Sequence, residues 1–370
     1  MMEDQRLYQI GLTMLEGVGD ILARQLLETF GDAESIFRMS RAALAKVPGI
    51  GSTLIAHLQD PNVLRRAEKE LRFIEDNRIS LYYIGDPNYP ARLRECADAP
   101  VLFYFKGETD LNAAHVLSIV GTRHATPYGI EQTESLLADL ATRFPDLLVI
   151  SGLAYGIDIQ AHRSAVRHGL PTVAVLAHGL DRIYPAIHRS TAVEMLKRGG
   201  LLTDFPTGTN PDRPNFVRRN RIVAGLSEAT LVVESAEKGG SLITADLADS
   251  YGREVFAFPG RVNDFYSAGC NGLIRQNKAA LIIDAVSLVE ALRWDVREPS
   301  RSLPQQTQLL FPEGEENGRI LHWLGQQGKA HINEIALAMN IPVSQLAPLL
   351  FELEMNGQIR SLPGGMYQLV

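Results

Sequence analysis

The sequence of 370 residues predicts an α/β fold built on a Rossmann-like, doubly wound and mostly parallel sheet. Three observations predict it. Short continuous apolar runs recur through the middle of the chain, as is typical of strands buried on both faces of a parallel sheet. Amphipathic segments of helical period alternate with these runs, as βαβ units require. Glycine-rich turns follow several runs, at the sheet edge where such folds bind ligands.

The predicted strands are short, and turn residues or helical segments separate them. They are Leu81–Ile84, Val101–Phe105, Val116–Val120, Leu147–Ile150, Thr172–Leu176, Leu201–Thr203, Ala229–Glu234, Glu254–Phe258 and Leu281–Ile283. Helices are expected between them, among others at Tyr128–Phe144, Ile157–His168 and Ser241–Tyr251. The first two strands precede the alternating pattern, and we expect them to extend the same sheet.

Pattern and composition divide the chain into four parts. We expect a helical domain of the helix-hairpin-helix (SAM-like) type over 1–78, the Rossmann-like domain over 79–296, a linker over 297–317 and a winged-helix domain over 318–370. The linker is rich in Pro, Gln and Ser, as flexible connections are. Several domains are also what a chain of this length requires, because a single hydrophobic core rarely serves so many residues.

Two short turns in the first part have the pattern hydrophobe-x-Gly-hydrophobe-Gly. They lie at Leu15–Asp20 and Val47–Ser52. This pattern resembles the helix-hairpin-helix turn, in which backbone amides bind a DNA phosphate. Arg24 follows the first turn, whereas only His57 follows the second. DNA contact and structural packing therefore both stay open for these turns, with packing as the default interpretation.

The last part of the chain has the pattern of a winged helix, three helices and a hairpin. We expect helices at Arg319–Gln327, Ile332–Asn340 and Val343–Asn356, and strands at Gln358–Ser361 and Met366–Leu369. A DNA-reading winged helix needs basic or amide side chains on its third helix. This helix offers Gln345 beside Glu352 and Glu354. We favour a contact with protein for this domain, and a weak contact with DNA stays open.

Composition excludes several classes of protein. The net charge is −7 and the pI about 5.8, so any binding of nucleic acid must rely on locally concentrated positive charge. Cys96 and Cys270 are isolated, and the nine His lack HExxH spacing, so neither a disulfide framework nor a metal site is expected. No basic-apolar leader and no long apolar run occur, which predicts a cytoplasmic protein without membrane contact.

Three turns after predicted strands are candidates for binding an anion. They contain Gly121-Thr-Arg123, Ser151-Gly152 and Lys238-Gly-Gly240-Ser241. Glycines at the start of a helix leave backbone N–H groups free to face a phosphate. Neither a Walker A sequence nor GxGxxG is present, so ATP and NAD are not indicated and no cofactor is expected.

An arginine-rich segment at 213–221 is the strongest local signal. It contains Arg213, Arg218, Arg219 and Arg221, with Asn220 and no acidic residue. A solvated helix face is the alternative interpretation. The segment follows a predicted strand, however, and arginine forms bidentate contacts with phosphate. Phe216 beside it is a candidate for stacking on an unpaired base.

Asp158 and His162 lie four residues apart and so share one face of a predicted helix. They are either an acid–His pair for hydrolysis or, as we favour, a helix-start carboxylate that orients the imidazole. We expect Tyr184-Pro185 to shape a loop wall. No nucleophile-elbow pattern and no paired carboxylates occur, so the sequence predicts binding groups without a chemical step, and a protein that is not an enzyme.

Many motifs in the middle of the chain resemble, in order, those of the DprA/Smf family (DNA processing protein A). They are Tyr89-Pro90, Pro100–Tyr104 with Lys106-Gly107, Val120–Arg123 with Tyr128-Gly129, Ser151–Asp158 with Ala161-His162, Tyr184-Pro185, Phe216–Ile222, Gly240–Ala245, Pro259-Gly260 and Gly269–Ile274. The resemblance implies a recombination mediator that binds single-stranded DNA, forms a homodimer through its Rossmann-like domain and loads the recombinase RecA onto the strand during natural transformation. It implies no catalysis.

The same resemblance implies which residues bind DNA phosphate. With Arg218 added from the arginine-rich segment, the expected phosphate-binding residues are Gly121, Arg123, Ser151, Gly152, Arg218, Arg219, Asn220, Arg221, Lys238, Gly240 and Ser241. An alternative is a nucleotide-phosphate-binding hydrolase, because this Rossmann variant also resembles the phosphoribohydrolases of the lysine-decarboxylase-like group. Such an enzyme needs a carboxylate near the ribose, for which Glu234 and Asp158 are the candidates.

Overall fold

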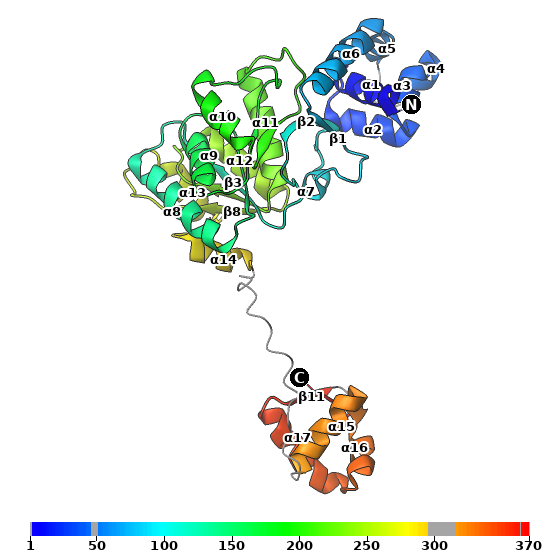
Figure 1. Ribbon diagram of the computed structural model, residues 1–370, viewed down its shortest axis with the longest axis vertical. Helices are drawn as coiled ribbons and strands as arrows, with labels where there is room; N and C mark the ends of the chain where they lie inside the picture. Colours follow the sequence, from blue (N-terminus) through cyan, green and yellow to red (C-terminus); the bar gives the residue numbers. More distant parts are fainter. Residues whose placement is uncertain (1, 46–50, 295–315, 363, 370) are drawn as a thin grey trace. The chain divides into compact units, whose positions relative to one another are not determined.

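The computed structural model describes residues 2–45, 51–294, 316–362 and 364–369. It contains two compact units, Met1–Val296 and Arg297–Val370 (Figure 1). The expected helical and Rossmann-like domains both belong to the first unit. The predicted linker over 297–317 lies almost entirely outside the described residues.

A nine-stranded sheet forms the centre of the first unit. Its strand order is β1-β2-β6-β5-β4-β3-β7-β8-β9. The strands are β1 (Ser80–Tyr83), β2 (Leu102–Gly107), β3 (Val116–Val120), β4 (Leu148–Ser151), β5 (Thr172–Val175), β6 (Gly200–Thr203), β7 (Ala229–Val232), β8 (Glu254–Ala257) and β9 (Ala280–Leu281). Strands β3 to β9 are parallel, whereas β2 is antiparallel to both β1 and β6. The predicted fold class is confirmed, and the first two strands do extend the sheet.

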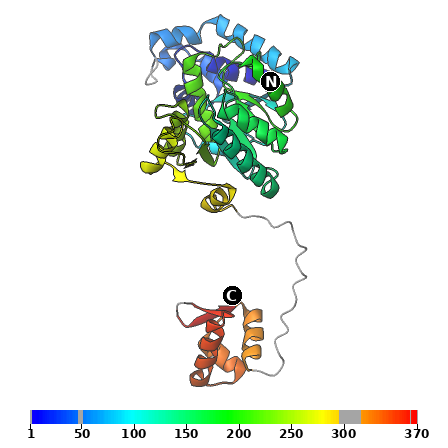
Figure 2. The same cartoon turned by 90° about the vertical axis from the view of Figure 1, so that its left-hand side faces the viewer.

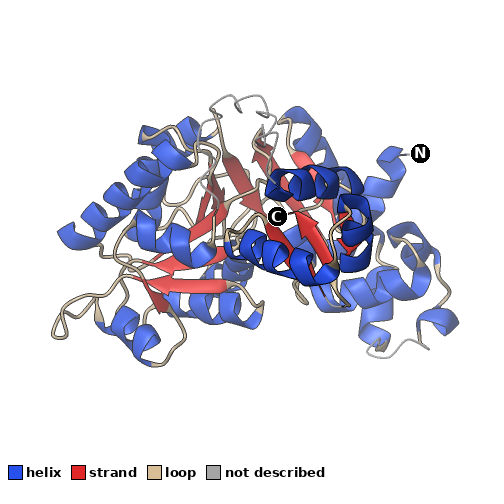
Figure 3. Ribbon diagram, turned by 90° about the horizontal axis from the view of Figure 1, so that it is seen from below, coloured by secondary structure: helices blue, strands red, loops and turns tan. Residues whose placement is uncertain are grey.

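Helices cover both faces of this sheet (Figure 3). They are α7 (Ala91–Arg94), α8 (Pro127–Arg143), α9 (Ile157–Arg167), η1 (Ala186–His188), α10 (Arg189–Met195), α11 (Arg213–Leu226), α12 (Gly240–Ser250), α13 (Ala268–Arg275) and α14 (Ala285–Leu292). In β3, Val116 and Val120 join the core under α11 and α12, while Leu117 and Ile119 join the core under α8 and α9. Burial on both faces explains why this strand reads as a continuous apolar run.

The direction of the chain through the sheet reverses beside β3. From β3 it proceeds through β4 and β5 to β6 on one side, and the strands on the other side are β7, β8 and β9. Strand β3 pairs in parallel with both β4 and β7. Because ligands of open α/β sheets bind beyond the carboxyl ends of the strands at such a reversal, the fold predicts a site after β3, β4 and β7.

Helices α1 to α6 pack against the antiparallel side of the sheet. They are α1 (Met2–Thr13), α2 (Asp20–Phe30), α3 (Ala33–Arg38), α4 (Arg41–Leu44), α5 (Ser52–Leu58) and α6 (Pro61–Asp76). Figures 1 and 2 show these helices (blue) against the body of the first unit. Val101, just before β2, completes the core of these helices, and Leu102 and Tyr104 of β2 share a second core with Ile10.

The first Gly-x-Gly turn is described, and its basic residue faces inward. Gly17 adopts a φ of 83°, and α2 begins at Asp20 directly after Gly19. Arg24 Nη1 donates to the carbonyl oxygen of Cys96 at 2.8 Å. Arg24 thus ties α2 to the sheet domain, which favours the packing interpretation of this turn. Most of the second turn, Val47–Ser52, lies outside the described residues.

The last strand of the sheet differs from the prediction. We expected Leu281–Ile283, whereas β9 comprises only Ala280–Leu281. It is an edge strand, and the side chains of Leu281 and Ile283 are 50% and 63% exposed. An apolar run therefore occurs here without the burial on two faces that the interpretation assumed.

The second unit is a winged helix, as predicted, with one further strand. It comprises α15 (Glu316–Gln327), β10 (Lys329–His331), α16 (Ile332–Met339), α17 (Val343–Met355), β11 (Ile359–Leu362) and β12 (Met366–Leu369). The strands form an antiparallel sheet in the order β10-β12-β11. The sequence analysis missed β10, because its three residues include a single apolar one, Ala330.

Two further findings concern the described residues. In them, no helix alone has the length and apolarity to cross a membrane, although α16 and α17, bent by 109° to each other, meet that criterion as a pair. Nor does a group of three or more His, Cys, Asp or Glu side chains arranged to hold a metal ion occur there.

Candidate nucleic-acid interface

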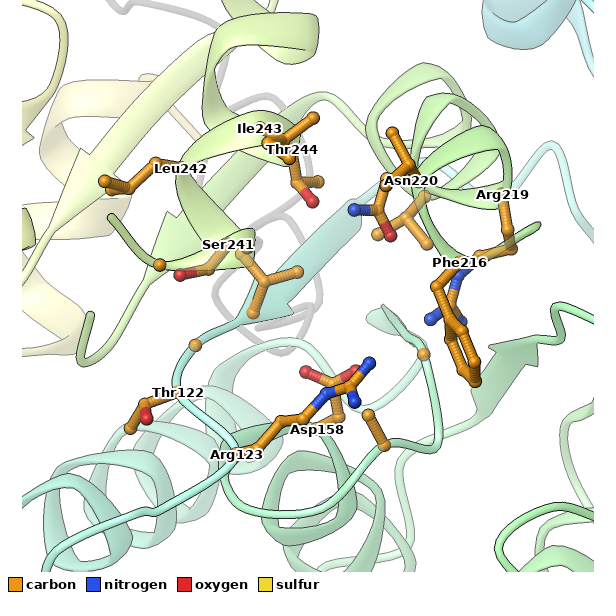
Figure 4. Close-up of a pocket in the computed structure, with 18 of the residues that line it drawn as sticks. Thr122, Arg123, Asp158, Phe216, Arg219, Asn220, Ser241, Leu242, Ile243 and Thr244 are labelled. Atoms are coloured by element: carbon orange, nitrogen blue, oxygen red, sulfur yellow. The ribbon is translucent and has the colours of Figure 1, made fainter. Parts of the chain in front are cut away.

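A pocket of about 760 Å³ lies at the carboxyl ends of β3, β4 and β7, where the chain direction reverses. The turns after these three strands form its walls, and α11 closes one side (Figure 4). Its charged lining consists of Arg123, Arg213, Arg219, Lys238, Asp158 and Asp246. Four basic and two acidic side chains thus line the pocket of a protein whose net charge is −7. This is the locally concentrated positive charge that binding of a polyanion requires.

The turn after β3 brings the backbone close to its neighbours. A Cβ atom at Gly121 would lie 2.8 Å from the Ile157 Cβ and 2.9 Å from the Glu234 carbonyl oxygen, so this position needs glycine. The Thr122 N–H donates to that same carbonyl at 2.7 Å. These contacts fix the turn and place the exposed Arg123 at the mouth of the pocket, with its guanidinium 5.0 Å from the centre of the Phe216 ring.

In the turn after β4, Gly152 lines the pocket but Ser151 does not. The Ser151 side chain is fully buried, and its hydroxyl donates to the Ile119 carbonyl at 2.6 Å. Ser151 therefore lies outside the pocket lining, where its hydroxyl links two neighbouring strands, and a direct contact with DNA phosphate stays a prediction. A Cβ atom at Gly152 would clash with the guanidinium of Arg219 and the carboxylate of Asp158. Both side chains thus converge on the space that this glycine leaves open.

Asp158 binds the turn itself rather than His162. Its carboxylate accepts backbone hydrogen bonds from Ala154 and Gly152. Burial raises its pKa, and the charges of Arg219 and Arg123 and these hydrogen bonds oppose that rise. We expected Asp158 to orient His162, and the structure corrects this. The carboxylate stabilises the turn after β4 and provides the negative charge that faces Arg219.

His162 is a structural residue. Thr172 Oγ1 donates to the Val149 carbonyl at 2.9 Å and so accepts from His162 Nδ1 at 2.8 Å. The other ring nitrogen, Nε2, then accepts from the Leu153 N–H at 3.3 Å. Burial, with the nearby charges of Arg219 and His188, lowers the pKa of His162 to about 3. The imidazole is therefore neutral at physiological pH and holds Leu153, whose φ is 56°, in its left-handed conformation.

Helix α11 presents Phe216, Arg219 and Asn220 to the pocket, one helical turn apart (Figure 4). Arg219 is 3% exposed and donates from Nη1 to the Val175 carbonyl, while its buried Nε has no hydrogen-bond partner among the residues that the structure describes. Burial lowers its pKa to about 10, and the carboxylate of Asp158 counteracts that effect. Arg219 remains a cation at neutral pH, buried at the base of the pocket.

Arg218 and Arg221 lie on another side of the same helix. Arg221 Nη2 is 2.6 Å from Asp204 Oδ2 and 2.9 Å from Asp20 Oδ2, and Arg218 Nη2 is 3.3 Å from both carboxylate oxygens. Burial alone would lower the pKa of the Arg221 guanidinium. The negative charges of Asp204 and Asp20 have the larger combined effect, so this pKa is raised. Arg218 and Arg221 do not line the pocket, because residues two and five positions after Phe216 cannot share its helix face. That they bind DNA phosphate stays a prediction.

The turn after β7 leads into α12, which begins at Gly240 without a side-chain cap. Lys238 is exposed and lines the pocket together with Gly240 and Ser241. The Ser241 hydroxyl donates to Ser235 Oγ at 2.9 Å, so it braces the turn. The uncapped helix start directs backbone N–H groups and positive dipole toward the pocket, as in phosphate-binding helices.

Glu234, a candidate carboxylate for hydrolysis, is committed to another contact. It is 2% exposed, and its Oε2 and Oε1 accept from the Thr126 N–H at 2.9 Å and from the Thr126 hydroxyl at 2.5 Å. It thereby anchors the start of α8. Of the two candidates, only Asp158 lines the pocket.

The sequence analysis missed several pocket residues. Arg213 was recognised in the arginine-rich segment but was not among the predicted phosphate ligands. Thr122, Ala154, Thr244 and Asp246 were not singled out as ligands although they belong to the three turns or to the helix that follows. Asp246 forms an exposed ion pair with Lys278, whose Nζ lies 2.8 Å from its Oδ1. Helical spacing from Gly240 would have indicated Thr244.

Three family models match successive parts of the chain and agree with this architecture. The family model DNA recombination-mediator protein A matches residues 80–293, which contain the whole pocket. The chain belongs to this family. The DprA winged helix domain model matches residues 304–365, and a SAM-like helix-hairpin-helix tandem model matches residues 10–58. The family model thus matches the sheet domain, and separate domain models match parts of the two flanking domains.

Individual relatives cover most of the sequence. Protein Smf of Escherichia coli is 35% identical over 83% of this chain and 84% of its own. The X-ray structure of DNA processing protein A from Streptococcus pneumoniae is 29% identical, has a TM-score of 0.62 and covers 77% of this chain and 97% of its own. A structure that describes the single-stranded DNA binding mode of DNA processing protein A from Helicobacter pylori is 29% identical and has a TM-score of 0.53. The match covers 58% of this chain and 96% of the Helicobacter pylori chain.

Proposed function

We propose that the pocket binds the phosphate backbone of single-stranded DNA and that Phe216 stacks on an unpaired base. The observation that carries this proposal is the convergence of Arg219, Arg123 and the uncapped start of α12 on one pocket. Arg219 donates one hydrogen bond to the Val175 carbonyl, while its buried Nε has no partner in the described part of the chain, so a phosphate oxygen would satisfy this donor.

The aromatic part of the site suits an unpaired strand rather than a duplex. The ring of Phe216 lines the pocket, where it is half-buried, with the guanidinium of Arg123 over it. Bases of a single strand expose their faces to such rings, whereas bases of a duplex are stacked on one another. The Helicobacter pylori relative, described for its single-stranded DNA binding mode, supports the same ligand.

Salt dependence of binding to a fluorescent poly-dT oligonucleotide tests the proposal. Arg123→Ala and Lys238→Ala each remove one exposed pocket cation, so each should weaken binding. Log K falls as log salt rises, and each variant should make this fall shallower by about 0.7, the value for one phosphate contact on a single strand. Arg72→Ala is the matched control, since Arg72 is 70% exposed on α6 and pairs with Glu68. Equal slopes in wild type and both pocket variants would remove phosphate binding as the role of this site.

The finer role that we propose is that of a recombination mediator without catalysis, which delivers the bound strand to the recombinase RecA. Faster assembly of RecA on strands covered by a single-strand-binding protein would support it, and no effect on assembly would contradict it. The alternative, hydrolysis of a nucleotide, predicts release of free base from a nucleoside monophosphate. Both oxygens of Glu234 are engaged by Thr126, which disfavours this alternative.

We further propose a homodimer formed through the Rossmann-like domain. The edge strand β9 and the start of α14 are the surface that we expect to dimerise. Leu281 of β9, Ile283 and Val286 of α14 expose 50%, 63% and 40% of their surface. Exposed apolar groups beside an unpaired strand edge favour association. Sedimentation equilibrium of Ile283→Lys should give a monomer where the wild type gives a dimer. A monomeric wild type would refute the proposal.

A further inference from the structure

A second exposed aromatic ring stands beside Phe216, on the loop that follows β5. Tyr184 is 45% exposed, and its ring centre lies 6.1 Å from that of Phe216 at an interplanar angle of 56°. Tyr184 does not line the phosphate pocket, whereas Phe216 does. The two rings are tilted, so neither covers the other face to face. Two neighbouring aromatic rings that are both accessible beside a ligand pocket form a surface on which unpaired bases can stack.

The loop that carries Tyr184 is fixed by its own hydrogen bonds. The Tyr184 N–H donates to His178 Nε2 at 3.3 Å, and His178 Nδ1 lies 2.9 Å from the Gly179 carbonyl oxygen. Burial lowers the pKa of His178, which keeps its ring neutral and able to accept this hydrogen bond. A few residues further, His188 Nδ1 lies 2.8 Å from the Leu153 carbonyl oxygen, in the turn after β4.

The same loop is tied to the segment that enters α11. Arg182 Nη1 donates to Asn210 Oδ1 at 3.0 Å, and the Gly208 N–H donates to Asp181 Oδ1 at 3.2 Å. Because α11 carries Phe216, the two aromatic rings are held by one connected framework. Their spacing is therefore set by the fold, and the exposed face of Tyr184 is organised before any ligand binds.

We propose that Tyr184 is a second base-stacking position, which follows Phe216 and extends the binding track beyond the phosphate pocket by one nucleotide. The inference rests on the proposed function, since it requires that the pocket bind a single strand. A strand whose phosphates occupy the pocket presents its bases at the rim, and adjacent bases can stack on the two tilted rings in turn. The expectation that Tyr184 only shapes a loop wall is thereby extended, because the residue itself would contact the ligand.

Binding of dT oligonucleotides of increasing length, compared between variants, tests this inference. Stacking of one base on one aromatic ring contributes about 1–3 kcal/mol, or about 5-fold to 150-fold in affinity. Tyr184→Leu should lose affinity by this order for long oligonucleotides and much less for those too short to reach the loop. The salt slope should not change, since no charge is removed. Tyr184→Phe, which keeps the ring, is the matched control and should bind like wild type.

The outcomes distinguish this inference from the proposed function. If wild type binds no oligonucleotide at low salt, the proposed function fails, and the inference fails with it. If wild type binds and Tyr184→Leu matches it at every length, only the inference fails. Equal losses in Tyr184→Leu and Tyr184→Phe would also overturn it, because they would assign the contact to the hydroxyl.

A measurement on unsubstituted protein avoids any effect of the variants on folding. Oligo-dT that carries 5-iodouracil crosslinks on irradiation to aromatic side chains in stacking contact. We expect crosslinked peptides that contain Tyr184 as well as peptides that contain Phe216. Crosslinks at Phe216 without any at Tyr184 would overturn the inference and leave the phosphate pocket intact.

Discussion

The carboxylate of Asp20 lies 2.9 Å from the guanidinium of Arg221, although 201 residues separate the two in sequence. Asp20 is the first residue of α2, so this ion pair joins the helix-hairpin-helix region to α11, the helix that carries Phe216 and Arg219. The other oxygen of Asp20 accepts from the Val101 N–H at 3.0 Å. One carboxylate therefore connects the N-terminal helices both to α11 and to the residue that precedes β2.

Arg221→Ala should destabilise the fold rather than remove a phosphate contact. Removing one partner of a buried ion pair leaves the other charge uncompensated and costs about 3–5 kcal/mol. The side chains of Arg221 and Asp204 are 8% and 1% exposed, so this range applies. Urea unfolding measures the loss. Arg218→Ala is the matched control, because Arg218 is 49% exposed and should cost about 1 kcal/mol or less. Unchanged stability with a lower salt slope in Arg221→Ala would contradict this assignment.

Gly152→Ala should weaken DNA binding and stability together. The added methyl group would occupy the space in which Arg219 and Asp158 meet, and such overpacking costs about 1–3 kcal/mol. Displacement of Arg219 should then reduce the affinity for poly-dT. Gly272→Ala, in α13 and outside the pocket lining, is the matched control. A Cβ atom there meets none of the described residues within 4 Å, so near-normal binding is expected. Equal affinities of the two variants would disprove the role of Gly152.

His162 should make stability fall in mild acid. Its pKa is about 3 in the folded chain, whereas an exposed His titrates near ~6.5. Above that value the neutral imidazole contributes fully. Below it the unfolded chain takes up a proton that the folded chain does not, so the free energy of unfolding decreases by about 1.4 kcal/mol per pH unit until the folded pKa is reached.

Urea unfolding between pH 7 and pH 4 measures this slope. His162→Gln should be less stable than wild type at neutral pH. Its free energy of unfolding should also decrease less steeply on acidification, because the contribution of His162 to that decrease is gone. His124→Gln, at an exposed position, is the matched control and should keep the wild-type slope. The same slope in all three proteins would show that His162 is not a neutral, buried group.

A chain that ends at residue 296 should retain most of its affinity for single-stranded DNA. Every residue that lines the pocket belongs to the first compact unit, and so do Phe216 and Tyr184. The third helix of the winged helix carries Glu352 and Glu354, which do not favour a polyanion. Fluorescence anisotropy of the truncated and full-length proteins measures this. Near-complete loss of binding in the truncated chain would assign the main DNA contact to the second unit.

Sequence reasoning found the three glycine-rich turns because local pattern alone determines them. A strand buried on both faces reads as an apolar run, and a glycine after it marks the turn, so Gly121, Gly152 and Gly240 could be placed without tertiary information. It also identified α11, because a segment with four arginines and no acidic residue of its own, 213–221, is unusual in an acidic protein.

It could not determine which face of α11 turns toward the pocket. Helical spacing groups Phe216 with Arg219 and Asn220, and separates Arg221 from them. That spacing alone does not say which group meets the ligand. The partner of Arg221 is Asp20, which lies far away in sequence and belongs to another domain. Ser151 was misplaced for a similar reason, since only the pairing of β3 with β4 brings its hydroxyl to the Ile119 carbonyl.

The order in which the pocket walls occur along the chain determines when the pocket is complete during protein synthesis. The first wall begins at Gly121 and the last ends at Asp246, with the walls from β4 and α11 between them. A growing chain that still lacks residues 238–246 has no third wall, so it cannot enclose a phosphate. During translation, the ability to hold a strand should therefore arise only after residue 246 has left the ribosome.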